Sequence, residues 1–246
     1  MRAGTTFLHA ALLSHPDVVS GTAGEHQFFS LRYAEGLGAY RAQLPWRWPN
    51  IVHRTIGVRR PLVIDCSPYY LYHPVAPERV KALPGSSMKA IVLLREPGER
   101  AWSHYRLNLA RGQEYLGFLE AIEAEQERLA GEHGRIVSGR EEANSPHQVF
   151  SYIGRGRYAG QLEHWWRAIP RDRFLLLRSD DLFDHTANIV ARVYDFLGLA
   201  PFDGYPRIPR NGLPYLPLPP RARAALDQIF ARPNSELHAL TGISFG

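Results

Sequence analysis

The sequence predicts an α/β fold in which a buried parallel sheet is covered by helices on both faces. Three short apolar runs, at 61–66, 89–94 and 173–178, have the length and the branched side chains of buried parallel strands. Segments with helical periodicity separate them, and this alternation is typical of a parallel sheet. The 246 residues are long enough for a substantial core, and no repeat or linker divides them. We therefore expect a single domain over residues 1–246.

The helices and loops follow from local signals along the chain. The first helix begins after Gly4 and ends near Pro16, because proline continues a helix poorly. Residues 17–60 show no long period and are expected to be irregular. Further helices are predicted at 76–83, 97–111, 115–130, 158–166 and 185–197, and two more close the chain, the last beginning at 233–236. Residues 131–147 are expected to form a polar loop, and residues 201–220 a proline-rich connection.

The composition bounds the class of protein. A formal net charge of +5, with 45% hydrophobic and 22% charged residues, is ordinary for a globular protein. All but two of the 29 basic residues are arginine, but they are scattered, so we expect no nucleic-acid partner. Cys66 is the only cysteine, which excludes an internal disulfide and fits a reducing cytoplasm. No apolar run approaches the roughly 18–20 residues of a membrane span.

The chain begins with a small turn, Arg2-Ala3-Gly4-Thr5-Thr6, that leads directly into an apolar helix. Glycine lets the backbone adopt a positive φ or approach a ligand closely. The free N–H groups and the positive dipole end of the helix favour an anion, most often a phosphate, and Arg2 adds a permanent charge. The alternative is an ordinary capped helix near a terminus. The turn lacks the lysine of a Walker A loop, which disfavours an ATPase, a GTPase or a nucleotide kinase.

Two further motifs lie downstream of this turn. Glu25-His26-Gln27-Phe28-Phe29 follows the first helix, and residues 93–105 read Leu-Leu-Arg-Glu-Pro-Gly-Glu-Arg-Ala-Trp-Ser-His-Tyr. Taken in order, the three motifs resemble those of the sulfotransferases that use 3′-phosphoadenosine 5′-phosphosulfate (PAPS). They are most similar to the branch that contains the heparan sulfate sulfotransferases and their bacterial relatives. The resemblance extends over nearly the whole chain and implies the three-layer, P-loop-type sulfotransferase fold.

The chain departs from the family pattern in three places. The family runs a strand directly into the phosphate loop, whereas this chain begins at Met1 with the loop itself, so we expect the usual first strand to be missing. Gly24 replaces the charged residue that usually precedes the glutamate. The late Lys-Gly-Arg donor loop has no counterpart in residues 207–212.

The resemblance implies which residues bind PAPS. Backbone N–H groups of the turn cradle the 5′-phosphosulfate, and Arg2 offsets the charge on the bridging oxygen as its bond breaks. Arg95 and Ser103 hold the 3′-phosphate, and Tyr158 contributes to the donor pocket. The implied donor-binding set is Arg2, Ala3, Gly4, Thr5, Thr6, Arg95, Ser103 and Tyr158. The residues alone leave alternatives open: an ion pair of Arg95 with Glu96 or Glu99, an ordinary helix-face serine and a core tyrosine.

Glu25 is the candidate general base, because heparan-type relatives use a glutamate at the matching place. It lies beside His26 and two phenylalanines, so we expect partial burial, which raises the pKa of a carboxylate toward a useful value. His26 is the rival base, since cytosolic relatives use a histidine at a different position. Asp65 and Ser67 follow a strand and are expected to line the acceptor cleft.

The sequence therefore predicts a cytoplasmic, PAPS-dependent sulfotransferase that acts on a saccharide or another small molecule. Its catalytic residues would be Glu25, Arg2 and His26, and no metal-binding motif is present. The alternative is a non-catalytic nucleotide-binding or interaction protein that has kept the fold. Gly24 and the missing first strand favour this alternative, whereas the preserved motif residues oppose it.

Overall fold

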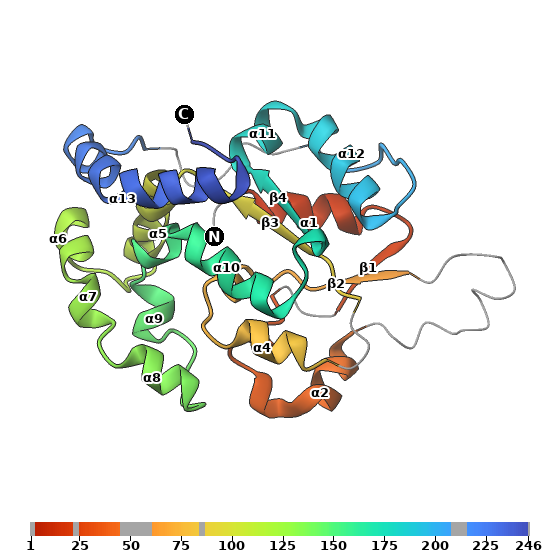
Figure 1. Cartoon of the computed structure of the whole chain (residues 1–246), viewed down its shortest axis with the longest axis horizontal. Coiled ribbons are helices and arrows are strands. Elements are labelled where there is room, and N and C mark those ends of the chain that lie inside the picture. Colours follow the sequence, from red (N-terminus) through yellow and green to blue (C-terminus); the bar gives the residue numbers. More distant parts are fainter. Residues whose placement is uncertain (1–2, 22–24, 45–60, 84–86, 208–215, 246) are drawn as a thin grey trace, which may run out of the picture.

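The computed structural model contains two pairs of parallel strands, of which β3 (Ala90–Leu94) and β4 (Phe174–Arg178) lie between the helices (Figure 1). The structure describes residues 3–21, 25–44, 61–83, 87–207 and 216–245. Strand β1 (Val18–Ser20) pairs with β2 (Leu62–Ile64), and β3 pairs with β4. Within the described ranges these form two separate two-stranded sheets. Arg2, Gly24 and residues 208–212, to which the sequence assigned roles or departures, lie outside those ranges.

The side chains of β3 alternate between two layers of helices. Ile91 and Leu93 join a hydrophobic cluster with α1 (Thr5–Leu13) and α12 (Thr186–Leu197). Val92 and Leu94 join another, with α10 (Tyr158–Ala168) and α13 (Pro220–Thr241). Figure 1 shows β3 and β4 surrounded by these helices. The structure therefore confirms the α/β prediction of parallel strands covered on both faces.

The β1/β2 pair is connected to the same core. Val18 of β1 and Ile64 of β2 pack in the cluster that contains the apolar face of α1. Helix α1 therefore lies against both strand pairs, and its N-terminal end is placed by the same contacts that build the core.

Eight further helices lie in the described ranges. They are α2 (Gly36–Gln43), α4 (Ala76–Lys81), α5 (Pro97–Ala110), α6 (Phe118–Glu123), α7 (Glu125–Arg128), α8 (Glu132–Val137), α9 (Pro146–Val149) and α11 (Ser179–Asp184). The described residues also form four 3₁₀ turns, at Tyr33–Glu35, Pro68–Leu71, Gly154–Gly156 and Arg171–Arg173. The three predicted strands are present, as are the helices expected near 76–83, 97–111, 158–166 and 185–197.

Four sequence predictions of secondary structure were wrong. Residues 17–60 are not irregular throughout, because they contain β1 and α2. The helix expected at 115–130 is divided into α6 and α7, and the loop expected at 131–147 contains α8. The two closing helices are one helix, α13, which continues through Pro233. Buried Phe230 and Leu237 lie on either side of that proline, so packing along one face stabilises the continuous helix.

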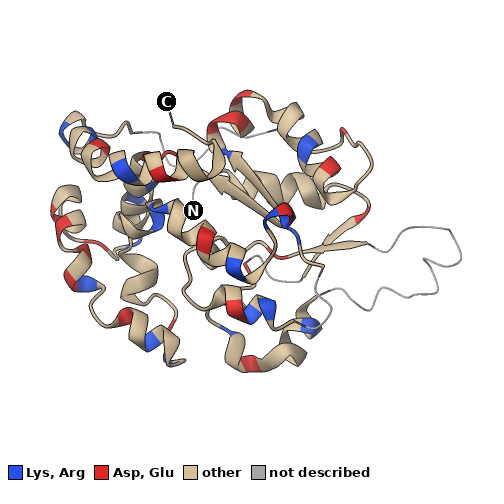
Figure 2. Cartoon of the chain, viewed as in Figure 1, with Lys and Arg blue, Asp and Glu red and all other residues tan. Residues whose placement is uncertain are grey.

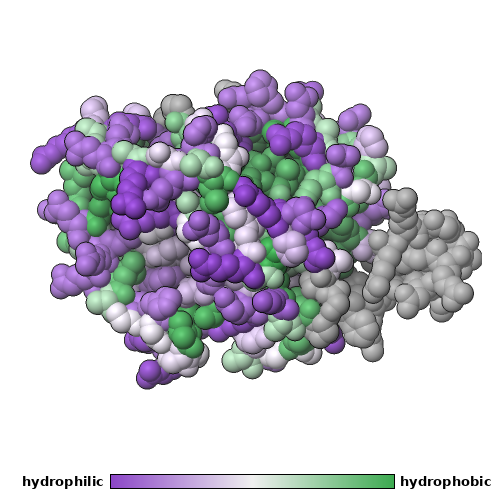
Figure 3. All heavy atoms as spheres, in the orientation of Figure 1, coloured by the Kyte–Doolittle hydropathy of each residue, from purple (hydrophilic) through white to green (hydrophobic). Residues whose placement is uncertain are grey.

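Charged and apolar side chains are mixed over the surface. Figure 2 shows basic and acidic positions interspersed along the helices, with no continuous basic stripe in this view. In the face drawn in Figure 3, hydrophobic side chains lie between hydrophilic ones. Among the described residues, no helix combines the length and the apolar character needed to cross a membrane.

Candidate functional site

The glycine turn of the first motif lies at the end of strand β4. Gly4 has a φ of 92° and precedes the first residue of α1. A Cβ atom on Gly4 would lie 3.0 Å from Leu182 Cδ2, so both the conformation and the space require glycine. Ser179, the residue after β4, donates a hydrogen bond from Oγ to the Ala3 carbonyl at 2.8 Å. The turn is thereby fixed to the carboxyl end of β4.

The start of α1 has the donors that an anion requires. No side chain of the described residues caps α1, and its first turn carries no acidic residue. Thr5 is half-buried and Thr6 is exposed. The first-turn N–H groups of a helix have no intrahelical partner, so this end of α1 fits a phosphate-like group. Arg2, predicted to stand beside it, lies outside the described residues.

The second motif reaches the same edge of the sheet. Leu94 of β3 is in register with Arg178 of β4, so Arg95 and Ser179 both follow the carboxyl ends of neighbouring parallel strands. Open α/β sheets bind ligands at this edge. Glu96 caps α5, accepting hydrogen bonds from the N–H groups of Gly98 at 2.7 Å and Glu99 at 2.6 Å. The Glu96 carboxylate is therefore engaged in capping α5. Ser103 lies further along the same helix and is half-buried.

Arg95 has two clear partners. Its Nη2 lies 3.3 Å from Glu99 Oε2, which confirms the ion pair that the sequence left as an alternative. Its carbonyl accepts a hydrogen bond from the Tyr158 hydroxyl at 2.8 Å. Tyr158 is buried, and burial raises the pKa of its hydroxyl to about 12, so it remains a donor at neutral pH. The first turn of α10 is thereby tied to the second motif.

Glu25 lies on the other side of the candidate site, and its burial was predicted wrongly. The residue is exposed. The turn that follows it buries Phe28 and Phe29 instead, because these rings pack on one another and on Tyr40. Gln27 Nε2 donates to Glu25 Oε2 at 2.5 Å, so the carboxylate is held by an amide rather than by apolar walls.

Gln27 is the centre of the turn that carries Glu25. It is one of two described non-glycine residues with a positive φ, 54°. Its side-chain Oε1 accepts a hydrogen bond from Ser30 Oγ at 2.8 Å, and its backbone N–H donates to Ser67 Oγ at 3.0 Å. Such a conformation costs free energy outside glycine, so these contacts must stabilise it. The sequence motif contains Gln27, but nothing in it reveals the positive φ.

The rival base, His26, is in a different environment. Its imidazole is fully buried, with Nδ1 3.5 Å from Gln43 Oε1 and the Tyr40 ring against its edge. The described residues give Nε2 no hydrogen-bond partner. A molecule in solvent can contact the exposed Glu25 carboxylate but not this ring. The structure therefore separates the two candidates by accessibility.

Asp65, which is expected from the sequence to line the acceptor cleft, accepts three hydrogen bonds. It follows β2 and accepts hydrogen bonds from Ser67 Oγ at 2.6 Å, the Tyr70 hydroxyl at 2.8 Å and the Tyr40 hydroxyl at 3.2 Å. Burial and the Asp65 charge raise the pKa values of both tyrosines. Since Ser67 also accepts from Gln27, a continuous hydrogen-bonded chain joins Asp65 to Glu25.

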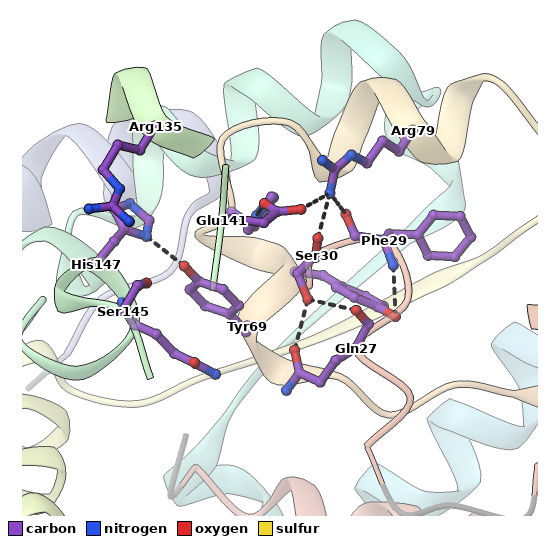
Figure 4. A network of polar contacts seen from close by, with 12 residues as sticks. Gln27, Phe29, Ser30, Tyr69, Arg79, Arg135, Glu141, Ser145 and His147 are labelled. Atoms are coloured by element: carbon purple, nitrogen blue, oxygen red, sulfur yellow. Dashed lines mark hydrogen bonds and ion pairs between the residues drawn. The ribbon is translucent and has the colours of Figure 1, made fainter. Parts of the chain in front are cut away.

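A second group of contacts holds the backbone of the same turn (Figure 4). Arg79 of α4 donates from Nη1 to the carbonyls of Phe29, at 3.0 Å, and Ser30, at 2.5 Å. Glu141 accepts from the same nitrogen at 2.7 Å and also pairs with His73. Arg79 and Glu141 are 62 positions apart, so no local sequence pattern could identify their contact, and sequence reasoning missed both.

Helix α1 connects the two sides. It begins at the glycine turn, and His9 lies one turn further along. Burial lowers the pKa of His9, and the nearby charges of His26 and Asp65 also act on it.

The fold and these contacts first define a class of protein. A glycine turn at a helix N-terminus and an arginine after the neighbouring parallel strand lie at one edge of an α/β sheet, an arrangement that suits an anion. Residues 1–205 match the family described as "Sulfotransferase domain". The chain belongs to this sulfotransferase family.

Individual relatives agree with this assignment. Heparan sulfate glucosamine 3-O-sulfotransferase 6 of Homo sapiens is 31% identical over 198 residues, which cover 80% of this chain and 50% of that protein. Its Mus musculus counterpart is 28% identical over 270 residues, covering 100% of this chain and 70% of that protein. The chain thus spans about half the length of the human relative.

A solved structure shows the same fold. The crystal structure of a sulfotransferase from Alicyclobacillus acidocaldarius aligns with a TM-score of 0.70 and 24% sequence identity. The alignment covers 99% of this chain and 93% of that chain, so the likeness extends over both.

Proposed function

We propose that the protein transfers a sulfuryl group from PAPS to a hydroxyl or amine of an acceptor. The observation that carries this proposal is the convergence of two motifs at one sheet edge. The Gly4 turn is bonded to the residue after β4, and Arg95 follows β3, the paired strand. Membership of the sulfotransferase family supports the reaction class.

The residues present fit the donor. The N–H groups at the start of α1 would hold the 5′-phosphosulfate, in the turn that Gly4 makes possible. Arg95 and Ser103 would hold the 3′-phosphate from the start and the second turn of α5. By resemblance, Arg2 would stabilise charge on the departing phosphate as an electrostatic clamp, since arginine does not give up its proton. No metal ion is needed in this scheme.

The exposed Glu25 would act as the general base. The sulfur–oxygen bond to the phosphate breaks as a bond forms from sulfur to the acceptor oxygen or nitrogen. Glu25 takes the proton that the acceptor loses, and the electron pair of the broken bond stays on the phosphate. The Gln27 amide, 2.5 Å away, holds the carboxylate in place. The side chain of Glu25 is exposed in the protein alone. A bound acceptor would cover it and so remove part of its contact with water.

The acceptor is proposed by class. The heparan sulfate relatives are named for glucosamine sulfation, which favours a saccharide, and a small molecule with a hydroxyl or amine is the other option. Hydroxyl groups around Asp65, from Tyr40, Tyr70 and Ser67, border this side of the site. The lone Cys66 is compatible with a cytoplasmic location, which we include in the proposal.

Donor binding provides the first test. Calorimetric titration should show the product nucleotide, 3′-phosphoadenosine 5′-phosphate (PAP), binding at least about tenfold more tightly than AMP, which lacks the 3′-phosphate. Arg95→Ala should cost about 2–4 kcal/mol of PAP affinity, because it removes a partly buried charge-assisted contact. Arg192→Ala, an exposed arginine on α12, serves as the matched control and should leave both affinities unchanged.

Turnover provides the second part of that test. PAP release from PAPS, measured across a panel of saccharides, phenols and amines, should rise with at least one acceptor. Equal binding of PAP and AMP would contradict the donor assignment. Tight PAP binding with no turnover on any acceptor would instead favour a non-catalytic nucleotide-binding protein.

A further inference from the structure

A second arginine shares the carboxylate that pairs with Arg95. Arg223, in the first turns of α13, bonds through Nη2 to Glu99 Oε1. Arg95 Nη2 lies 3.3 Å from the other oxygen of the same carboxylate. The family match ends at residue 205. Arg223 lies beyond it, in the helix that follows the next connecting segment. The contact therefore brings a residue from outside the matched region to the second motif.

Core packing fixes the position of Arg223. Its neighbours Ala222 and Leu226 are buried in the cluster that contains Ala101 of α5. A Cβ atom on Gly98 would lie 3.3 Å from Leu226 Cδ1, so glycine permits α13 to approach the start of α5 this closely. Trp102 Nε1 also donates to the Leu216 carbonyl at 2.8 Å, which holds the segment before α13. The guanidinium is thus presented by a helix docked on the core.

The charges around Arg223 indicate which contact an anion can replace. Glu96 is 3.6 Å from Arg223 Nη1, but its oxygens already accept the two N–H bonds that cap α5. Glu99 contributes one carboxylate to two guanidinium groups. The side chains of Arg95, Glu99 and Arg223 are 20%, 13% and 40% exposed, so a ligand from solvent can reach them.

We propose that Arg223 binds the 3′-phosphate of the donor nucleotide together with Arg95, and that this phosphate takes the place of the Glu99 carboxylate. This inference rests on the proposed function. A phosphomonoester offers three oxygens and up to two negative charges, so it can satisfy both guanidinium groups better than one carboxylate can. Glu99 then acts as an internal competitor that lowers the affinity for the nucleotide.

The test compares PAP with AMP in calorimetric titrations of the full chain. Arg223→Gln should weaken PAP binding about five- to thirtyfold and leave AMP binding within twofold, because only PAP carries the 3′-phosphate. Arg221→Gln is the matched control, since Arg221 is an exposed arginine two positions away in the same helix. It should leave both affinities unchanged.

The opposite change tests the competition. Glu99→Gln should tighten PAP binding about three- to tenfold, because the phosphate no longer has to replace a charged partner. Glu236→Gln removes the carboxylate of the exposed Arg232–Glu236 pair on α13 and should have no effect. If Arg223 only fastened α13 to α5, both variants at the shared contact would lower the melting temperature without changing the PAP-to-AMP affinity ratio.

The outcomes separate this inference from the proposed function. If wild type prefers PAP and Arg95→Ala abolishes that preference, while Arg223→Gln retains the full ratio, the role of Arg223 is refuted and the proposed function stands. Weaker PAP binding by Glu99→Gln would refute the competition. If wild type does not distinguish PAP from AMP, both the inference and the donor assignment are wrong.

Discussion

The proposed donor and acceptor sides of the candidate site hold their charged groups in different ways. On the donor side, Arg95 and Arg223 pair with a carboxylate, and all three side chains are partly exposed. On the proposed acceptor side, Asp65 accepts hydrogen bonds from three neutral hydroxyl groups, those of Ser67, Tyr40 and Tyr70.

This difference indicates a division of roles. Partly exposed ion pairs contribute little to stability and exchange readily with a ligand anion. Three hydrogen bonds to one half-buried carboxylate are costly to break together, so they fix the geometry of the turn that carries Glu25. We therefore expect donor-side changes to alter nucleotide affinity, and acceptor-side changes to alter turnover or stability.

The largest expected effect is on turnover. Glu25→Gln keeps the shape of the side chain but removes the basic carboxylate, and a general base contributes about 10²–10⁴ in rate. We expect kcat to fall by that factor while PAP affinity stays within twofold, as measured by PAPS turnover and calorimetry.

His26→Gln is the comparison variant for this change. Because the His26 ring is buried, its loss should lower the free energy of unfolding more than it lowers the rate of sulfuryl transfer. We expect the kcat of the folded variant to fall less than about tenfold. A folded His26→Gln protein without activity, beside a Glu25→Gln protein of normal activity, would identify His26 as the base.

The next effect is on stability. Asp65→Asn replaces one accepting oxygen with an N–H₂ group that cannot accept a hydrogen bond from a hydroxyl. We expect the free energy of unfolding in urea to fall by about 2–4 kcal/mol. Tyr40→Phe removes one of the three hydroxyl donors and should cost only about 1 kcal/mol. PAP affinity should be retained in both folded variants, and a parallel loss would show that the two sides are not independent.

Parts of the fold could be predicted because their signals are local. Strand β3 is a continuous apolar run, and α5 begins with Glu96 and Pro97, which are a cap and a favoured first residue. Strand β1 was missed because it has three residues and exists through pairing with β2, far along the chain. Two helices were predicted in place of α13, because proline usually ends a helix. The apolar face that continues past Pro233 keeps the helix in one piece.

The same distinction applies to the candidate site. Glu25 and Arg95 belong to contiguous motifs, so both could be selected as candidate site residues from the sequence. The exposure of Glu25 could not be predicted, because it depends on the direction in which the turn at Gln27 points the neighbouring side chains. The positive φ of Gln27 has no signature in the local sequence. The contact of Arg223 with Glu99 joins residues 124 positions apart and depends on the docking of two helices.

The smallest effect tests whether Tyr158 acts directly or through Arg95. Its hydroxyl donates to the Arg95 carbonyl, so Tyr158→Phe removes one buried hydrogen bond and should cost about 1 kcal/mol of stability. If Tyr158 only positions Arg95, PAP should bind about three- to fivefold more weakly, and Arg95→Ala with Tyr158→Phe should bind PAP no worse than Arg95→Ala alone. Calorimetry on the two single variants and the double variant measures this coupling. If the losses of PAP affinity in the two single variants instead add up in the double variant, Tyr158 contributes to nucleotide binding independently, as the family resemblance implies. Losses that arise from one shared contact cannot add, because the first substitution already removes that contact.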